Sequence, residues 1–230
     1  MNISHPAIKI DNGSKAWYAG KQRIQILQKI NLSVNTNESL AVMGPSGAGK
    51  STLLHILGFL TPLDEGAIWF NGQQITDRSQ WWSRSLRQNI GFIFQDAKLI
   101  PELSVLENVC LPLAHRGVWP ARQKKLARAE IAKVGLEDRA HHRPNQLSGG
   151  ELMRVAIARA VVQKPKILLA DEPTGNLDSR TGTRIVELLV EMVTSECALV
   201  FVTHNESLTT YADRIVYMKD GQLEFKEQNR

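Results

Sequence analysis

The chain has 230 residues, of which 43% are hydrophobic, and its formal net charge is +5 at pH 7. This length suits a single large α/β domain, with or without an inserted subdomain. The chain contains no run of about 18 apolar residues and no N-terminal basic segment followed by an apolar one, so the sequence predicts neither a membrane-spanning helix nor a secretory signal.

The N-terminal part of the chain shows strand patterns separated by polar segments. We expect an edge strand at Ala7–Asp11 and then a polar loop at Asn12–Gln22, which carries Trp17 and Tyr18. Asn71-Gly72 is a strong signal for a two-residue hairpin turn. Short apolar or alternating runs predict further strands at Ile24–Val34, where a bulge is expected, and at Ser39–Met43, Ala67–Asn71 and Ile90–Phe94.

The stretch Gly44–Ser51, GPSGAGKS, fits the pattern G-x-x-x-x-G-K-[ST] and lies between a predicted strand and a predicted helix at Thr52–Leu57. In this setting such a loop cradles phosphates with its backbone N–H groups. We expect Lys50 to reach the β- and γ-phosphates of a nucleoside triphosphate, and the Ser51 hydroxyl to ligate Mg²⁺. The nucleotide-binding residues predicted in this stretch are Gly44, Pro45, Ser46, Gly47, Ala48, Gly49, Lys50, Ser51 and Thr52.

Helical spacing replaces the strand patterns between Asp96 and Gln146. The predicted helices there are Val105–Ala114, Pro120–Val134 and Glu137–His142. We interpret this region as a helical subdomain inserted in an α/β core, with hinges near Gln95 and Leu147. Beyond it, helices are predicted at Glu151–Gln163, Ser179–Thr194 and Glu206–Ala212, and strands at Ile167–Asp171, Ala198–Val202, Arg214–Met218 and Gln222–Phe225.

Two carboxylates, Asp171 and Glu172, end the buried-type strand that begins at Ile167. The carboxyl ends of strands are where α/β sheets bind ligands. In a chain that also carries a phosphate loop, Asp171 is placed to hold Mg²⁺, and Glu172 to orient or deprotonate an attacking water. The alternative is that both acids only cap the segment that follows them.

The segment Leu147-Ser148-Gly149-Gly150-Glu151 predicts a second anion-binding helix N-terminus in the same chain. Taken alone, it is also an ordinary serine-capped helix start. One nucleotide does not require two such helix ends from one subunit. We therefore expect the second helix end to serve a nucleotide that is held by another copy of the chain.

Charge and cysteines give weaker indications. The densest basic run comprises Arg122, Lys124, Lys125 and Arg128, and we interpret it as a solvated helix face. Cys110 and Cys197 lie in apolar stretches and are expected to be buried thiols of a cytosolic protein.

In this order, the motifs GPSGAGKS, Gln95, LSGGE, ILLADE, GNLD and His204 resemble those of the nucleotide-binding subunits of ABC transporters. The resemblance extends from about Ile8 to Gly221. The segments PNQLSGGE, RVAIARA, DEPTGNLDSRTG, LENV and IGFIFQ resemble more closely the lipoprotein-releasing and macrolide-exporting (MacB/LolD-like) group, which includes the cell-division ATPase FtsE. Glu151 departs from the glutamine of many members, and Leu152-Met153-Arg154 from a more polar pattern.

The resemblance implies an α/β fold with a P-loop NTPase core, a mixed sheet, an N-terminal antiparallel β subdomain and the helical insert. It implies one domain over residues 1–230, with the core at about 1–95 and 164–230 and the helical subdomain at about 96–163. It also implies an ATP-dependent homodimer in which each phosphate loop faces Ser148, Gly149 and Gly150 of the other copy. For single residues, the resemblance implies that Glu172 is the catalytic carboxylate and that His204 contacts the γ-phosphate. Gln95 would contact Mg²⁺ and the attacking water, and Asp178 would lie at the dimer seam. Trp17, or its neighbour Tyr18, would stack on the adenine.

The function implied by the resemblance is ATP hydrolysis that powers a separate membrane permease, at the cytoplasmic face of the inner membrane. The cofactors would be ATP and Mg²⁺, and a periplasmic adaptor would be a further partner. A regulatory ATPase of the FtsE kind is the first alternative. A nucleic-acid-linked ATPase is a second, against which the sequence offers no heptad run for coiled-coil arms, so we expect no nucleic acid partner.

Overall fold

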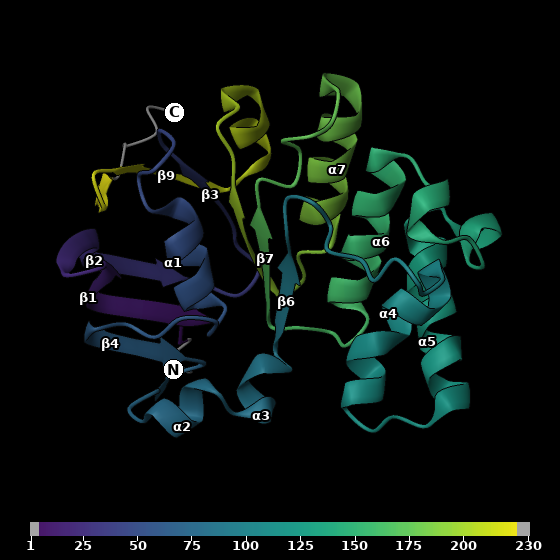
Figure 1. The fold of residues 1–230 in the computed structure, drawn as a ribbon, viewed down its shortest axis with the longest axis horizontal. Helices are drawn as coiled ribbons and strands as arrows, with labels where there is room; N and C mark the ends of the chain where they lie inside the picture. The colour runs from purple at the N-terminus through teal and green to yellow at the C-terminus, as the bar shows by residue number, and fades with distance from the viewer. Residues whose placement is uncertain (1–4, 225–230) are drawn as a thin grey trace.

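A computed structural model describes residues 5–224, with all their side chains except that of Arg78 (Figure 1). A six-stranded sheet forms the centre of the molecule. Its spatial order is β10 (Gln222–Glu224), β9 (Arg214–Lys219), β3 (Ser39–Met43), β8 (Ala198–Val202), β7 (Ile167–Asp171) and β6 (Ile90–Ile93). The β9–β10 pair is antiparallel and the other neighbouring strands are parallel, so the sheet is mixed, as predicted.

The inner strands of this sheet are apolar along their whole length because both faces are covered. In β7, Leu168 and Ala170 join a core with four helices, from α4 (Val105–His115) to α7 (Ser179–Glu191) along the chain, whereas Ile167 and Leu169 join a second core on the opposite face. Successive side chains of a strand point to opposite faces, so a continuous apolar run fills two cores at once. The second core contains helix α1 (Lys50–Leu57) and the smaller sheet.

The smaller sheet is antiparallel, with the order β2 (Gln22–Val34), β1 (Ile8–Ala19), β4 (Glu65–Phe70) and β5 (Gln73–Gln74). Two sequence predictions are wrong here: Ala7–Asp11 does not form an edge strand, and 12–22 is not a loop. Strand β1 lies between β2 and β4 and continues to Ala19. Register shifts between Ile10 and Ala16 interrupt the alternation of apolar and polar residues, which is why the pattern resembled a loop.

Two hairpin turns have the geometry that their sequences predict. Asn71 and Gly72 have φ angles of 49° and 78°, and Asp220 and Gly221 have φ angles of 48° and 76°. Positive φ at both central residues is the requirement of a type I′ turn. The strand after Asp220-Gly221 ends at Glu224, and Phe225, which was predicted to belong to it, lies outside the described residues.

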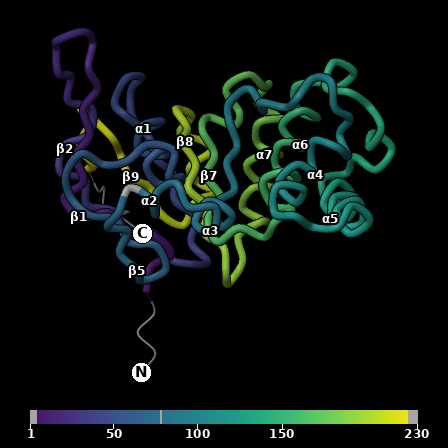
Figure 2. Tube along the Cα trace, turned by 60° about the horizontal axis from the view of Figure 1, so that its bottom comes forward, coloured from purple at the N-terminus to yellow at the C-terminus, as the bar shows by residue number. Residues whose placement is uncertain are grey.

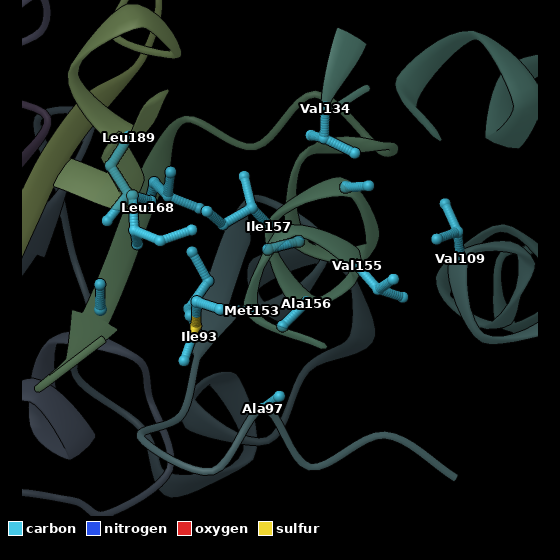
Figure 3. Close-up of a cluster of buried hydrophobic side chains, with 14 of the residues drawn as sticks. Ile93, Ala97, Val109, Val134, Met153, Val155, Ala156, Ile157, Leu168 and Leu189 are labelled. Atoms are coloured by element: carbon cyan, nitrogen blue, oxygen red, sulfur yellow. The ribbon is translucent and has the colours of Figure 1, made fainter. Parts of the chain in front are cut away.

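The helical region packs on one face of the central sheet. It comprises α4 (Val105–His115), α5 (Pro120–Lys133), the short 3-10 helices Glu137–Arg139 and Pro144–Gln146, and α6 (Gly149–Val161). Figure 3 shows α6 at the centre of this core, with Ile157 and Met153 toward Leu168 and Ile93 and with Val155 toward Val109. Helices α4, α5 and α6 therefore form close to their predicted bounds. The helix predicted at Glu137–His142 does not form in full, because only a 3-10 helix at Glu137–Arg139 is present there.

Four more helical segments complete the fold. They are α2 (Arg78–Trp81), α3 (Arg84–Arg87), α7 (Ser179–Glu191) and a 3-10 helix at Glu206–Tyr211. Helices α2 and α3 have four residues each, too few to show a period in the sequence, and were not predicted. No helix within residues 5–224 is long and apolar enough to cross a bilayer. The α/β class with its two sheets is confirmed, whereas the subdomain limits at 95 and 163 stay a prediction.

Candidate active site

Four neighbouring parallel strands bring the predicted site residues to one edge of the central sheet. The phosphate loop follows β3, and His204 lies two residues beyond the end of β8. Asp171 ends β7, and Gln95 lies two residues beyond the end of β6. The strands are adjacent in the order β3, β8, β7, β6, and parallel strands end at the same edge of a sheet. Residues that are far apart in the sequence therefore line one site.

The phosphate loop has a conformation that only glycine adopts easily at three positions. Gly44, Gly47 and Gly49 have φ angles of 144°, 79° and 104°. A Cβ atom on Gly44 would lie 2.0 Å from the carbonyl oxygen of Met218. The Lys50 ammonium, which is buried, donates to the carbonyl oxygens of Gly44 and Pro45 at 2.9 Å each. Its charge is thus held across the mouth of the loop, where phosphate oxygens would offer it stronger acceptors.

Ser51 and Asp171 form the pair expected at a magnesium site. The Ser51 hydroxyl donates to Oδ1 of Asp171 at 3.1 Å. Burial raises the pKa of Asp171, and the nearby Glu172 charge raises it further, against the hydrogen bond from Ser51 and the positive charges of Lys50 and His55. The charged form of a carboxylate that is poorly solvated in this way is stabilised when a hard cation such as Mg²⁺ binds to it. No cluster of three or more His, Cys, Asp or Glu side chains within residues 5–224 could hold a metal, so Mg²⁺ here would need phosphate and water oxygens as further ligands.

Glu172 and His204 lie together at the ends of β7 and β8. Nδ1 of His204 is 3.5 Å from Oε2 of Glu172. Glu172 has a φ of 43°, in the left-handed region that non-glycine residues rarely occupy. Such strain persists only where the surrounding structure imposes it, and it occurs preferentially at functional sites. The carboxylate is thereby turned into the site beside the histidine.

Gln95 packs against the segment that follows Glu172. A Cβ atom on Gly175 would lie 2.9 Å from Nε2 of Gln95, so the glycine lets the two segments approach. Beyond Gln95, Ala97 and Lys98 both have positive φ angles, 57° and 47°. Their carbonyl oxygens each accept a hydrogen bond of 2.6 Å from the guanidinium of Arg159, on α6. Burial lowers the pKa of Arg159.

The segment at Ser148 begins α6 with a complete capping box. The backbone N–H of Ser148 donates to Glu151 at 2.8 Å, and the N–H of Glu151 donates back to the Ser148 hydroxyl at 3.3 Å. Gly150 leaves no room for a side chain, because its Cβ would lie 2.6 Å from Thr181. Asp178 caps α7 by accepting from the N–H of Thr181 at 3.0 Å. The helix-cap alternative for Ser148 therefore describes a real contact, and Asp178 is a helix cap as well.

Helices α1 and α6 belong to different layers. The side chains of α1 pack in the core on one face of the central sheet, and those of α6 pack in the core on the other face. The phosphate loop and Ser148 thus mark two helix starts that lie on opposite sides of the central sheet, as Figure 1 shows for the helices.

Sequence reasoning missed some contacts that shape the site. Arg159 was not singled out, although an arginine between apolar positions of a helix is a signal for a buried acceptor. The Lys15–Asp64 ion pair, at 2.7 Å, was missed because residues 12–22 were expected to form a loop. Trp17 and Tyr18 both lie on β1, at the tip of its hairpin with β2, which extends beyond the rest of the sheet in Figure 2. Their exposed fractions are 47% and 71%.

Comparisons with known proteins agree with this geometry. The family model described as ABC transporter matches residues 27–175. The chain is 42% identical to the lipoprotein-releasing system ATP-binding protein LolD of Coxiella burnetii, over 97% of both chains. It is also 42% identical, over 97% of both chains, to an uncharacterized ABC transporter ATP-binding protein, MJ0796, of Methanocaldococcus jannaschii. A dimeric structure of MJ0796 in a post-hydrolysis state with ADP and Pi superposes with a TM-score of 0.87, covering 97% of this chain and 99% of that one.

Proposed function

This chain belongs to the ABC transporter family, and from that premise we propose how its ATPase site works and what it drives. It is an ATP-binding, ATP-hydrolysing subunit of the lipoprotein-releasing type. The observation that carries the proposal is the convergence of the phosphate loop, the Ser51–Asp171 pair and Glu172 with His204 at one sheet edge.

At this edge each residue has a distinct part. The backbone N–H groups of the phosphate loop and the Lys50 ammonium bind the β- and γ-phosphates. Ser51 and Asp171, with Gln95, would hold Mg²⁺, which neutralises charge on the phosphate oxygens. Glu172 accepts the proton of the attacking water, and His204, beside it, donates to the γ-phosphate. The strained φ of Glu172 keeps its carboxylate oriented before the substrate arrives.

A second copy of the chain completes the site. The opposite positions of α1 and α6 support this, because one chain cannot direct both helix starts at the same γ-phosphate. Two chains in a head-to-tail arrangement bring Ser148, Gly149 and Gly150 of one copy to the phosphate loop of the other, with Asp178 at the seam. The dimeric MJ0796 structure bound to ADP and Pi supports a dimer that holds nucleotide. Loss of the γ-phosphate removes these contacts and opens the dimer.

The permease would dock at a basic cavity of about 620 Å³ between α3 and α4. Arg84, Arg87, His115 and Arg116 line the cavity, and none of the described lining residues is acidic. Figure 1 shows α3 directly below the start of β6, the strand that leads to Gln95. An acidic cytoplasmic segment of a permease complements this charge and would sense the state of the ATP site through β6 and α4. The chain would thus lie at the cytoplasmic face of the inner membrane, bound through its permease; a periplasmic adaptor would contact only that permease.

Co-purification tests this function. The tagged Glu172→Gln variant, solubilised from membranes with ATP, is expected to retain a permease with few spanning segments and a large outer domain. Recovery of a cell-wall enzyme complex would favour the regulatory alternative, and recovery of nucleic acid alone would overturn the transporter assignment.

Charge reversal tests the docking cavity separately. Arg87→Glu together with Arg116→Glu is expected to abolish permease recovery while the ATPase of the isolated subunit stays unchanged. Lys125→Glu, on the exposed face of α5, changes charge in the same sense outside the cavity and is the matched control. Equal recovery from the double variant and the control would refute the cavity as the docking surface.

A further inference from the structure

The hairpin that carries Trp17 is fastened to the loop after α1 by one carboxylate. Oδ1 of Asp64 accepts from the Lys15 ammonium at 2.7 Å, and Oδ2 accepts from the N–H of Ala16 at 2.8 Å. The N–H of Asp64 in turn donates to the carbonyl oxygen of Ser14 at 3.0 Å. Although partial burial would raise it, the pKa of Asp64 is lowered by these two hydrogen bonds and by the charge of Lys15. Asp64 therefore holds β1 at three successive residues.

The Lys15 ammonium lies over the ring of Trp17, 5.4 Å from its centroid. Lys15 is only 8% exposed, so its charge is poorly hydrated, and a desolvated cation on an aromatic face is attracted more strongly than an exposed one. Because the ion pair with Asp64 fixes the ammonium, one face of the indole is occupied. Trp17 is 47% exposed, so ring surface remains on which a planar ligand can stack.

The register of the hairpin decides which aromatic residue faces the phosphate loop. Lys15 pairs with Leu27 on β2, so their side chains share one face of the sheet. The Leu27 side chain lies against the phosphate loop, since a Cβ atom on Gly49 would be 2.9 Å from its Cδ2. Trp17 is two residues after Lys15 and shares this face, whereas Tyr18 points to the opposite one.

The same carboxylate connects the indole to the phosphate loop through α1. Helix α1 starts at Lys50 in the phosphate loop and ends at Leu57, and Asp64 follows it within the loop that leads to β4. The two ends of this short segment therefore fix the phosphates and the indole relative to one another. A base bound beside the indole would be positioned by the same element that binds its phosphates.

We propose that Lys15 is a positioning residue for the nucleotide base: held by Asp64, its ammonium covers one face of Trp17 and presents the other face to adenine. The inference rests on the proposed function, in which the phosphate loop binds ATP. The cation also draws electron density from the indole, which strengthens its stacking on an electron-rich purine. Lys15 acts through Trp17 and touches no reacting atom.

A comparison of two ligands tests the proposal. Lys15→Met is expected to raise the dissociation constant for ATP by about two- to five-fold, because the indole would keep its own stacking on the base and lose only the orientation that the cation gives it. The same variant should bind inorganic tripolyphosphate, which has no base, as the unchanged chain does. Lys15→Arg, which keeps the cation, should restore ATP affinity. Lys9→Met is the matched control, because Lys9 also pairs with an aspartate, Asp11, and lies 5.0 Å over a tryptophan ring, that of Trp69, away from the phosphate loop.

Each outcome separates this inference from the proposed function. Trp17→Ala should weaken ATP binding by about five-fold or more, as loss of a base stack does, without affecting tripolyphosphate. If Trp17→Ala weakens ATP binding but Lys15→Met does not, the role of Lys15 is refuted while the ATP site stands. If Lys15→Met weakens both ligands equally and lowers the melting temperature, Lys15 is only structural. If neither ligand binds the unchanged chain, the proposed function itself fails.

Discussion

Ser148 gives the sharpest test of the composite site, because its hydroxyl is at once a helix cap and a proposed ligand of the partner's γ-phosphate. Ser148→Ala removes the acceptor for the Glu151 N–H and should cost about 1 kcal/mol of folding free energy. For a chain of this size the melting temperature should fall by about 2–4 °C. Glu151→Gln keeps the capping box, which accepts either side chain, and should leave stability and ATPase activity nearly unchanged.

Ser148→Asp combined with Glu151→Gln is expected to keep the stability of the chain and to abolish most of its ATPase activity. Aspartate caps a helix as well as serine does, and the second change removes the carboxylate that would repel it, so the melting temperature should stay near that of Glu151→Gln. A negative charge at about 4 Å from the γ-phosphate would oppose dimer closure by about 4 kcal/mol at an effective dielectric constant of about 20. Closure, and with it ATPase activity, should fall about 1,000-fold.

The assays are thermal unfolding of the free chain and steady-state ATP hydrolysis at saturating ATP. Ser148→Ala should lose stability and, with the hydroxyl ligand gone, activity as well, whereas the double variant should lose activity without losing stability. A double variant that hydrolyses ATP at the rate of Glu151→Gln alone would refute the placement of Ser148 against the partner's nucleotide. An unchanged melting temperature in Ser148→Ala would refute the prediction that the Ser148 cap contributes about 1 kcal/mol to folding.

Three further predictions concern the site within one chain. Glu172→Gln should slow hydrolysis by about 100-fold or more yet leave ATP binding intact, so that size-exclusion chromatography with ATP shows a persistent dimer; normal turnover would contradict its assignment as the base. Because the pKa of Asp171 is raised, Mg²⁺-dependent ATP affinity should begin to fall at a higher pH, as the solution is acidified, than it would with an ordinary aspartate, and Asp171→Asn should remove this pH dependence. In the free chain the contribution of Asp171 itself to stability should be fully present below pH 3.8, where it is protonated in the folded and unfolded states, and should be lost as pH rises through the raised pKa. Arg159→Met leaves the carbonyl oxygens of Ala97 and Lys98 without their partner and should lower stability by about 1–3 kcal/mol in denaturant titrations; Arg159→Lys, with a single point charge, should recover only part of it.

Local chemistry explains which parts of the fold the sequence predicts well. The turns at Asn71-Gly72 and Asp220-Gly221 need positive φ angles that these residue pairs adopt, and the structure has them. The continuous apolar runs of β7 and β8 predict strands buried on both faces, because side chains that are apolar on both faces of a strand need to be covered on both. Ser148 and Glu151 predict the start of α6 through a contact that spans only three residues.

Non-local pairing explains where the sequence misleads. Strand β1 runs through residues 12–19 because β2 and β4 hydrogen-bond to it on both sides, and because Asp64 compensates the buried charge of Lys15. No window of sequence around Lys15 contains that partner. The short helices α2 and α3 likewise lack a period and depend on their neighbours.

For the site, the sequence by itself determined the chemistry: a loop that binds phosphate, a serine and an aspartate suited to Mg²⁺, and a glutamate after a buried strand. Each of these depends on residue types within a few positions of one another. Only the tertiary structure decided which groups meet, because strand order brings Glu172 to His204 and Gln95 to Gly175. It also places Trp17 and Tyr18 on opposite faces of β1, since the face on which a side chain lies depends on a register that bulges shift and that only the paired strand fixes.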